Sequence, residues 1–218
     1  MEVTNTNVYN LAEALVASGL PMNADYDAEK FQEDAERIYG AGVMYHEDEN
    51  GHPTNLSEIK RAIRLVNAGD DNSGHKNFLT GILVSFNVTA SNVWWMQFER
   101  YHFIQIVSSQ SKMHKLKELS TSLKALELLS YDDITWFDDS IEAYKRGEID
   151  ETDLIYTCPM GLQLTAHCTT NYMQLRTIYK QRKSHKLPEW KKFCNWIKTL
   201  PYAEEFITGK EDGEEKSK

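Results

Sequence analysis

Two clusters of amide, hydroxyl and guanidinium side chains could recognise a flat ligand that carries phosphate. The first cluster holds Gln97, Arg100, Tyr101 and His102, and Ser111 follows after eight residues. A guanidinium binds phosphate oxygens or a carbonyl edge through two parallel hydrogen bonds. An amide presents both a donor and an acceptor to a planar ring. The first cluster therefore predicts a site for a nucleotide-like molecule.

The second cluster lies near the end of the chain and offers the same chemistry. It holds Asn171, Gln174 and Arg182, with the arginine eleven residues after the asparagine. The alternative for the two amides is a pair of hydrogen bonds between helices. The alternative for the basic run around Arg182 is a solvated helix end that the helix dipole favours. The residues alone leave both interpretations open.

A polar segment separates the first cluster from the helical region after it. Ser108, Ser109, Gln110 and Ser111 interrupt an apolar run and predict a loop or a kinked helix end. Because a polar loop beside a buried helix is where anions bind, we interpret the segment as part of a substrate site. The alternative is a simple surface loop.

Hydrophobic periodicity predicts the elements that position these clusters. Phe78–Thr89 alternates apolar and polar residues and predicts a strand. A helix capped by Asn92 is expected to carry the first cluster, and Met160–Arg182 is expected to be one long helix. Further helices are predicted at Leu11–Ser18, Asp27–Tyr39, Asn55–Val66, Lys115–Leu129, Trp136–Gly147 and Pro188–Leu200.

These elements predict an α+β fold in which a modest antiparallel sheet is flanked by several helices. The chain has no internal repeat and no linker, so residues 1–208 are expected to form a single domain. Residues 209–218 are charged and almost without apolar groups, which predicts a disordered tail. Residues 45–55 predict a loop. Its acidic and histidine residues match no strong ligand spacing, so no metal site is expected there.

Composition excludes several classes of function. The net charge is −9, which disfavours general attraction to nucleic acid or to anionic lipid. No apolar run reaches the length of about 18 residues that a transmembrane helix needs, and no secretory signal is expected. The three cysteines match no paired spacing, which favours reduced thiols in a cytoplasmic protein.

In this order along the chain, the motifs resemble the flavin-dependent thymidylate synthases. That family places a glycine–histidine turn before a strand, then Gln-x-x-Arg and a serine on the following segment. Later it has Asn-x-x-x-Leu with an arginine eleven residues after the asparagine. The matching residues here are Gly74, His75, Gln97, Arg100, Asn171, Leu175 and Arg182, with Ser111 matching after one inserted residue. The resemblance covers Gly74–His114 and Pro159–Trp190.

The resemblance implies an enzyme that transfers a one-carbon unit to a pyrimidine deoxynucleotide such as deoxyuridylate. It implies FAD as the cofactor, NADPH and methylenetetrahydrofolate as further reactants, and a homotetramer. Reduced flavin would deliver the hydride, so no cysteine nucleophile is required. The expected FAD contacts are His75, Arg100, Tyr101, His102 and Asn171. The expected substrate contacts are Gln97, Ser108, Ser109, Gln110, Ser111, Gln174 and Arg182, of which Ser111 and Arg182 are the catalytic candidates.

Two further functions remain open. Met113 and Gly81 stand where the family has an arginine and a histidine. These differences favour a protein that binds a nucleotide or a flavin on the same scaffold without turnover. The third hypothesis is an interaction module without a small ligand, which the aromatic residues around Trp94 and the acidic charge would suit.

Overall fold

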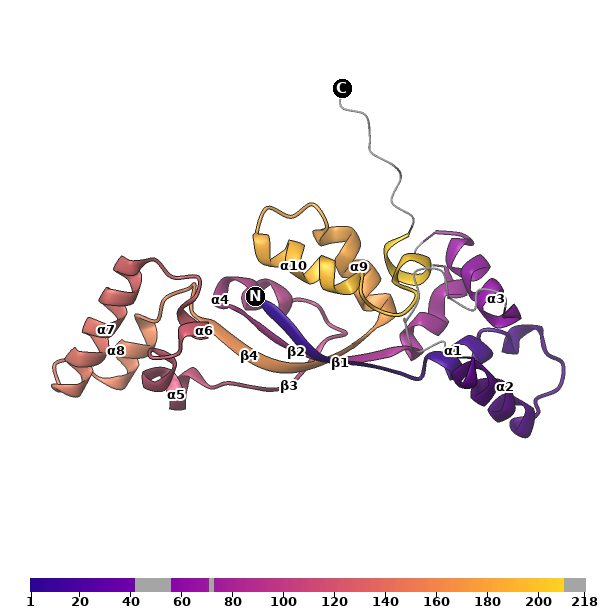
Figure 1. Cartoon of the computed structure of the whole chain (residues 1–218), viewed down its shortest axis with the longest axis horizontal. Coiled ribbons are helices and arrows are strands. Elements are labelled where there is room, and N and C mark those ends of the chain that lie inside the picture. The colour runs from indigo at the N-terminus through magenta and orange to yellow at the C-terminus, as the bar shows by residue number, and fades with distance from the viewer. Residues whose placement is uncertain (42–55, 71–72, 210–218) are drawn as a thin grey trace, which may run out of the picture. The chain divides into compact units, whose positions relative to one another are not determined.

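The computed structural model describes residues 1–41, 56–70 and 73–209 of the chain (Figure 1). It confirms the predicted α+β class, with a four-stranded antiparallel sheet in the order β1-β2-β4-β3. The strands are β1 (Glu2–Tyr9), β2 (Leu83–Ser91), β3 (Gln105–Ser109) and β4 (Gln163–Asn171). The expected loop at 45–55 and the tail from 210 onward lie outside the described residues.

The chain divides into two compact units, which we describe separately. Unit 1 comprises Met1–Asn5 and Phe86–Cys168, and unit 2 comprises Thr6–Ser85 and Thr169–Lys218. The helices of unit 1 are α4 (Asn92–Phe98), α5 (Lys112–Leu119), α6 (Leu123–Leu126), α7 (Tyr131–Lys145) and α8 (Glu151–Tyr156).

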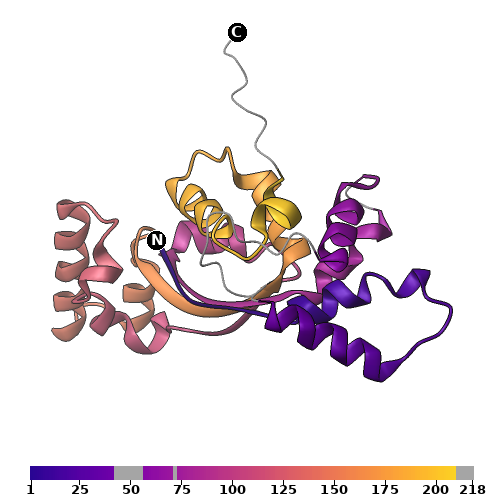
Figure 2. The ribbon, with the colours of Figure 1, turned by 45° about the vertical axis from the view of Figure 1, so that its right-hand side comes forward.

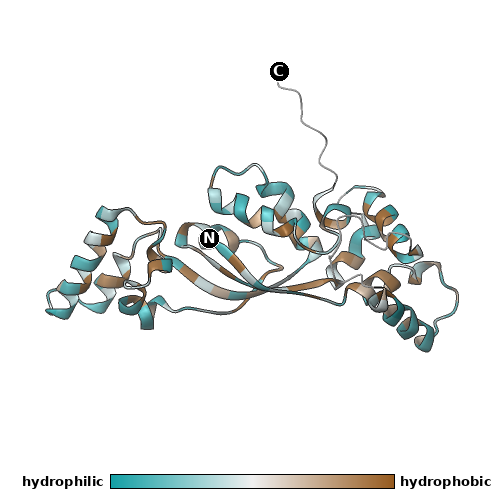
Figure 3. Ribbon diagram, in the orientation of Figure 1, coloured by the Kyte–Doolittle hydropathy of each residue, from teal (hydrophilic) through white to brown (hydrophobic). Residues whose placement is uncertain are grey.

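Unit 2 is built mainly from helices. They are α1 (Leu11–Ala17), η1 (Leu20–Met22), α2 (Ala28–Gly40), α3 (Ser57–Asn67), η2 (Gly74–Gly81), α9 (Tyr172–Arg182), α10 (Pro188–Ile197) and η3 (Glu204–Thr208). Helices α1, α2 and α3 lie side by side (Figures 1 and 2). Hydrophilic and hydrophobic residues alternate along α2 and α3, as expected for helices that bury one side (Figure 3).

Main-chain hydrogen bonds fix the register of β2 against β4. The N–H of Asn92 donates to Leu162 and the N–H of Tyr172 donates to Ile82, so the two strands run antiparallel. In this register Asn87 lies opposite His167, and Thr89 lies opposite Thr165. Both are pairs without mutual main-chain hydrogen bonds, in which opposing side chains come closest.

Helix α4 supplies the aromatic core of unit 1. Ser91 caps the helix by accepting a hydrogen bond from the N–H of Trp94, so the cap is one residue earlier than predicted. Trp94 and Phe98 are fully buried and stack with ring centroids 4.3 Å apart. The Nε1 of Trp95 donates to the carbonyl of Leu164 in β4, so α4 packs on the sheet.

Two sequence predictions about the ends of these elements were wrong. The strand begins at Leu83 rather than Phe78, because Gly74–Gly81 forms the 3-10 helix η2. Helix α4 ends at Phe98, so Arg100 and Tyr101 lie in the turn after it rather than on it.

The larger error concerns Met160–Arg182, which is not one helix. Gln163–Asn171 is strand β4, and only Tyr172–Arg182 is helical. Burial alternates along β4, where Leu164, Ala166 and Cys168 are buried and the residues between them are half-buried. This burial has the period of two that a strand with one face on the core shows.

Residues 105–129 also differ from the prediction. Ser108 and Ser109 belong to strand β3 rather than to a loop, and the predicted helix Lys115–Leu129 is two helices, α5 and α6. The Ser120-Thr121-Ser122 segment ends α5 and caps α6, since the Ser122 hydroxyl accepts from the N–H of Ala125. Hydroxyl side chains offer the backbone partners that compete with a continuous helix.

An ion pair in unit 2, between the exposed Arg37 and the buried Glu58, gives a pH-dependent contribution to stability. Arg37 donates to Glu58 at 2.6 Å, and the Glu58 side chain is 9% exposed. Burial by itself raises the pKa of Glu58. Hydrogen bonds from its own N–H, from Arg37 and from Ser57 outweigh burial and leave the pKa below its usual value.

We therefore expect Glu58→Gln to lower the free energy of unfolding at neutral pH, with a smaller effect in acid. A carboxyl whose pKa is lower in the folded state stabilises the fold above its unfolded pKa, and this contribution is lost as pH falls through the folded pKa. Urea unfolding of both proteins at about pH 7 and about pH 3 measures the difference. An equal difference at the two pH values would contradict the prediction.

A buried lysine binds the main-chain carbonyls that follow helix α3. The Lys76 side chain is 2% exposed, and its Nζ donates to the carbonyls of Ala68, Gly69 and Asp70 at 2.6–3.3 Å. Removing the ammonium in Lys76→Met would leave these carbonyls without that donor, so we expect a loss of about 1–3 kcal/mol in unfolding free energy. Lys60→Met, at an exposed position of α3, is the matched control and should change stability little.

Candidate functional site

The first cluster of predicted site residues surrounds the end of α4 and the strand after it, all in unit 1. Gln97 is half-buried on the last turn of α4, and Tyr101 is half-buried just beyond that turn. Arg100 and His102 are exposed. The guanidinium of Arg100 and the imidazole of His102 are therefore accessible to a ligand at the surface of unit 1.

Gln110 and Ser111 connect β3 to α5 and have different roles. The N–H of Gln110 donates to the carbonyl of Thr165, and its side-chain oxygen accepts from the N–H of Thr165 at 2.8 Å. Gln110 thus fastens the segment to β4. Ser111 is the N-cap residue of α5, but its hydroxyl makes no capping hydrogen bond. Ser111 is therefore better placed than Gln110 to contact a ligand.

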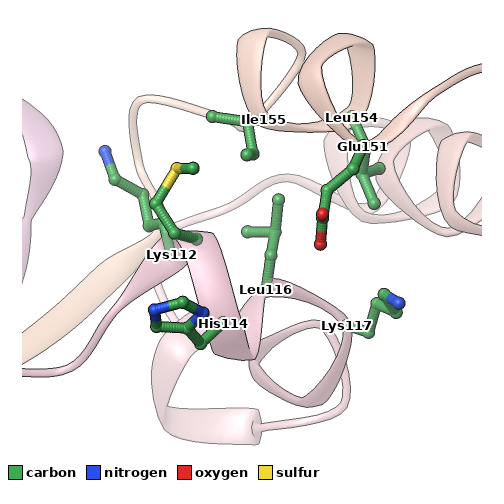
Figure 4. A pocket seen from close by; sticks show the side chains of 8 residues that line it. Lys112, His114, Leu116, Lys117, Glu151, Leu154 and Ile155 are labelled. Carbon is green, nitrogen blue, oxygen red and sulfur yellow. The ribbon is translucent and has the colours of Figure 1, made fainter.

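A pocket of about 220 Å³ lies between α5 and α8 in unit 1 (Figure 4). Lys112 stands at one end of it and Lys117 at the other, with His114 also on the α5 side and Glu151 on the α8 side. Its volume is below the range of about 300–1,000 Å³ that is usual for drug-sized ligands. Its lining combines the lysines of α5 with the carboxylate of Glu151 in α8.

Lys112 is held in position by α4. Its Nζ donates to the Asn92 side-chain oxygen at 3.1 Å, and the Asn92 amide donates to the carbonyl of Pro159. Asn92 begins α4, and Gln97 lies five residues further on, about 7.5 Å along the helix axis.

The three cysteines do not supply a nucleophile. Burial raises the pKa of Cys158, although Lys112 and Asn92 moderate the rise. Burial raises the pKa of Cys168 to about 12 and that of Cys194 to about 11. A thiolate is the reactive form of cysteine, so raised values mean that all three stay protonated near neutral pH.

The structure brings together a polar patch of β2 and β4 that the sequence analysis missed. The Thr89 and Thr165 hydroxyls lie 2.7 Å apart, and His167 Nδ1 lies 2.7 Å from the Asn87 side-chain oxygen. Two hydroxyls that share one hydrogen bond keep one further proton to donate. An amide oxygen only accepts, so His167 donates from Nδ1 to the Asn87 side chain.

The second predicted cluster lies in unit 2, on helix α9. Asn171 is the N-cap residue, and its side-chain oxygen accepts from the N–H of Gln174 at 2.9 Å. Arg182 is at the other end of the helix, about 16 Å along the axis, with its guanidinium 4.5 Å from the centre of the Trp190 ring. The exposed His75 is in η2, which packs against α9.

No group of three histidine, cysteine, aspartate or glutamate side chains in the described parts of the chain is arranged to hold a metal ion. No helix within residues 1–41, 56–70 or 73–209 is long and apolar enough to span a membrane.

Comparisons with known proteins give a likeness of fold. No protein-family model matches the sequence, and no curated protein is significantly similar to it. Thymidylate synthase X from Helicobacter pylori, solved with FAD and dUMP, matches with a TM-score of 0.62 at 17% identity, covering 95% of this chain and 97% of that one. A second structure of that enzyme with FAD and dUMP has a TM-score of 0.60 at 15% identity, covering 95% and 98%.

Proposed function

We propose that this protein is a flavin-dependent enzyme of pyrimidine deoxynucleotides, similar to thymidylate synthase X. The observation that carries the proposal is the fold likeness, which extends over nearly all of both chains. The ordered motifs of the sequence support the same conclusion independently. The reaction would add a one-carbon unit to deoxyuridylate or a related nucleotide.

The nucleotide would bind with its phosphate at the start of α5. The first N–H groups of a helix have no partner within the helix and attract anions. Ser111 and Lys112 add a hydroxyl and a positive charge at the same place. The family has an arginine where this chain has Met113. Lys112 would supply the positive charge that Met113 lacks. Glu151 would accept a hydrogen bond from the sugar.

In unit 1, polar groups of β2 and β4 are candidates for contact with the flavin. The Thr89–Thr165 and Asn87–His167 pairs place two hydroxyls, an amide and an imidazole on neighbouring cross-strand pairs, and groups of these kinds hydrogen-bond the edge of a flavin ring. His75, Arg100, Tyr101, His102 and Asn171 are the further FAD residues of the proposal. Bound reduced flavin would supply the hydride, with NADPH as its reductant and methylenetetrahydrofolate as the one-carbon donor.

The remaining proposed substrate residues are Gln97, Ser108, Ser109, Gln110, Gln174 and Arg182. Ser111 and Arg182 are the candidates for direct contact with the reacting nucleotide. The protein would hold the rings in register and polarise the pyrimidine, which is the usual contribution of a protein to cofactor chemistry. The three thiols, which burial keeps protonated, agree with a reaction that needs no cysteine nucleophile. Because the cysteines are free, we place the protein in the cytoplasm, where thiols stay reduced.

Reconstitution tests this function directly. The purified protein is incubated with FAD, desalted and examined for flavin absorbance. Deoxyuridylate is then titrated by calorimetry. Formation of thymidylate from deoxyuridylate, NADPH and methylenetetrahydrofolate is followed by mass spectrometry. We expect stoichiometric FAD and a methylated nucleotide. A protein that binds neither FAD nor deoxyuridylate would refute the proposal.

A binding protein without turnover is the second candidate. Met113 is 59% exposed, and Gly81 packs against Ala14 and accepts a hydrogen bond from Asn10 at 3.0 Å. Neither residue can replace the cation or the imidazole expected at its position. The measurement that separates the two candidates is NADPH oxidation by the FAD-loaded protein with and without deoxyuridylate. Binding without stimulated oxidation would favour this second function.

A further inference from the structure

Strand β3 forms an open edge of the sheet in unit 1. In the order β1-β2-β4-β3 it has a neighbour on one side only among the described residues (Figure 1). All five of its residues are exposed, including Val107 at 60% and Ile106 at 39%, and the preceding Phe103 is 70% exposed. An exposed apolar edge strand is a template for pairing with another strand.

The pairing of β3 with β4 shows which main-chain groups face the open edge. The N–H of Gln110 donates to Thr165, so the main chain of Gln110 faces β4. Main-chain groups alternate in direction along an antiparallel strand, so Ser108 and Ile106 also face β4. The N–H and C=O groups of Gln105, Val107 and Ser109 therefore point outward.

The composition of β3 suits pairing with an identical strand. The sequence Gln-Ile-Val-Ser-Ser contains no charge, and any charge would meet its own copy with like sign across a two-fold axis. It also contains no proline, and no lysine, the residues with which proteins usually protect an edge. The strand thus lacks the features that would prevent contact between two copies.

We propose that β3 pairs antiparallel with β3 of a second copy, about a two-fold axis at Val107. The two Val107 residues would exchange two hydrogen bonds, and Gln105 of each copy would pair with Ser109 of the other. The pair would close six main-chain hydrogen bonds and join two four-stranded sheets into one. The Val107 side chains of the two copies would be direct cross-strand neighbours.

The β3 pairing would provide an interface for the homo-oligomer expected from the sequence resemblance. This pairing does not require bound flavin. An isologous contact of this kind uses the same residues on both copies. The mass and cross-linking measurements below require no ligand. Failure of the flavin assay and failure of this interface are therefore separate results.

Main-chain substitution tests the hydrogen bonds. We expect the wild-type protein to be at least a dimer by sedimentation velocity, and Val107→Pro to weaken association at least about tenfold by removing an outward N–H. Val107→Thr keeps the N–H and is the matched control. Circular dichroism and urea unfolding establish that each variant is folded. A monomeric wild-type protein, or an unchanged mass for folded Val107→Pro, would overturn the proposal.

Cross-linking tests the position of the axis. Residues of a hydrogen-bonded pair have Cα atoms about 5.5 Å apart, a distance that a disulfide spans. Val107→Cys should therefore form an intermolecular disulfide on mild oxidation. Gln105→Cys should not, because the two copies of residue 105 would be about 13 Å apart along the strands. Equal cross-linking of the two variants, after subtraction of the wild-type background, would place the axis elsewhere and refute this register.

Discussion

Replacing Lys112 by methionine is expected to weaken the binding of deoxyuridylate about 10–100-fold, because a hydrogen bond to a charged group contributes about 1.5–3 kcal/mol. Lys112 is the first residue of α5 and lines the pocket, and Asn92 holds its ammonium group. Methionine keeps the length of the side chain and removes the charge. Calorimetric titration of both proteins with deoxyuridylate at one salt concentration measures the change.

Lys115→Met provides the control for Lys112→Met. Lys115 is exposed on the same helix, does not line the pocket, and forms an ion pair with Glu118 at 2.8 Å. Its loss changes the net charge by the same amount, so general attraction of the nucleotide changes equally in the two variants. Equal affinities of the two variants would show that the phosphate does not bind at the start of α5.

Replacing Trp94 by alanine is expected to lower the free energy of unfolding by about 3–5 kcal/mol, as for other large aromatic residues in cores. Trp94 is fully buried, stacks on Phe98, and contacts Trp95 edge to face with centroids 5.2 Å apart. Truncation removes the ring and leaves a cavity beneath α4. Urea unfolding monitored by circular dichroism gives the change.

Met96→Ala is the control for Trp94→Ala on the same helix. Met96 is 57% exposed, so its truncation removes little packing and should change the unfolding free energy by less than about 0.5 kcal/mol. If Trp94→Ala lowered the free energy of unfolding no more than Met96→Ala does, Trp94 would not be part of the core. Trp94→Phe, which keeps a ring, should fall between the two.

Helices with a regular apolar period were predictable from the sequence. Helices α1, α2 and α10 lie where the residue pattern predicted them, and Asp27 caps α2 by accepting from the N–H of Lys30. These signals are local, because capping and helical periodicity involve residues within one or two turns. The alternation in β2 was local in the same way.

Strands β3 and β4 were not recognised because sheet formation depends on distant partners. Gln163–Asn171 satisfies its main chain only when β2 and β3 lie on either side of it, and β2 comes about 80 residues earlier. The apolar residues Leu164, Ala166 and Cys168 are also compatible with a helix when they are considered without neighbours. β-structure is more dependent on context than helix formation.

The sequence by itself determined the α+β class, the positions of α1, α2 and α10 to within a few residues, and the residue types whose chemistry suits a nucleotide. Only the tertiary structure decided what surrounds each of those residues. Gln110 fastens β3 to β4, and Asn171 caps α9, whereas Thr89, Thr165, Asn87 and His167 meet across strands. The physical reason is that a side chain's chemistry is intrinsic to its type, while its hydrogen-bond partners and its exposure depend on residues far away in the sequence.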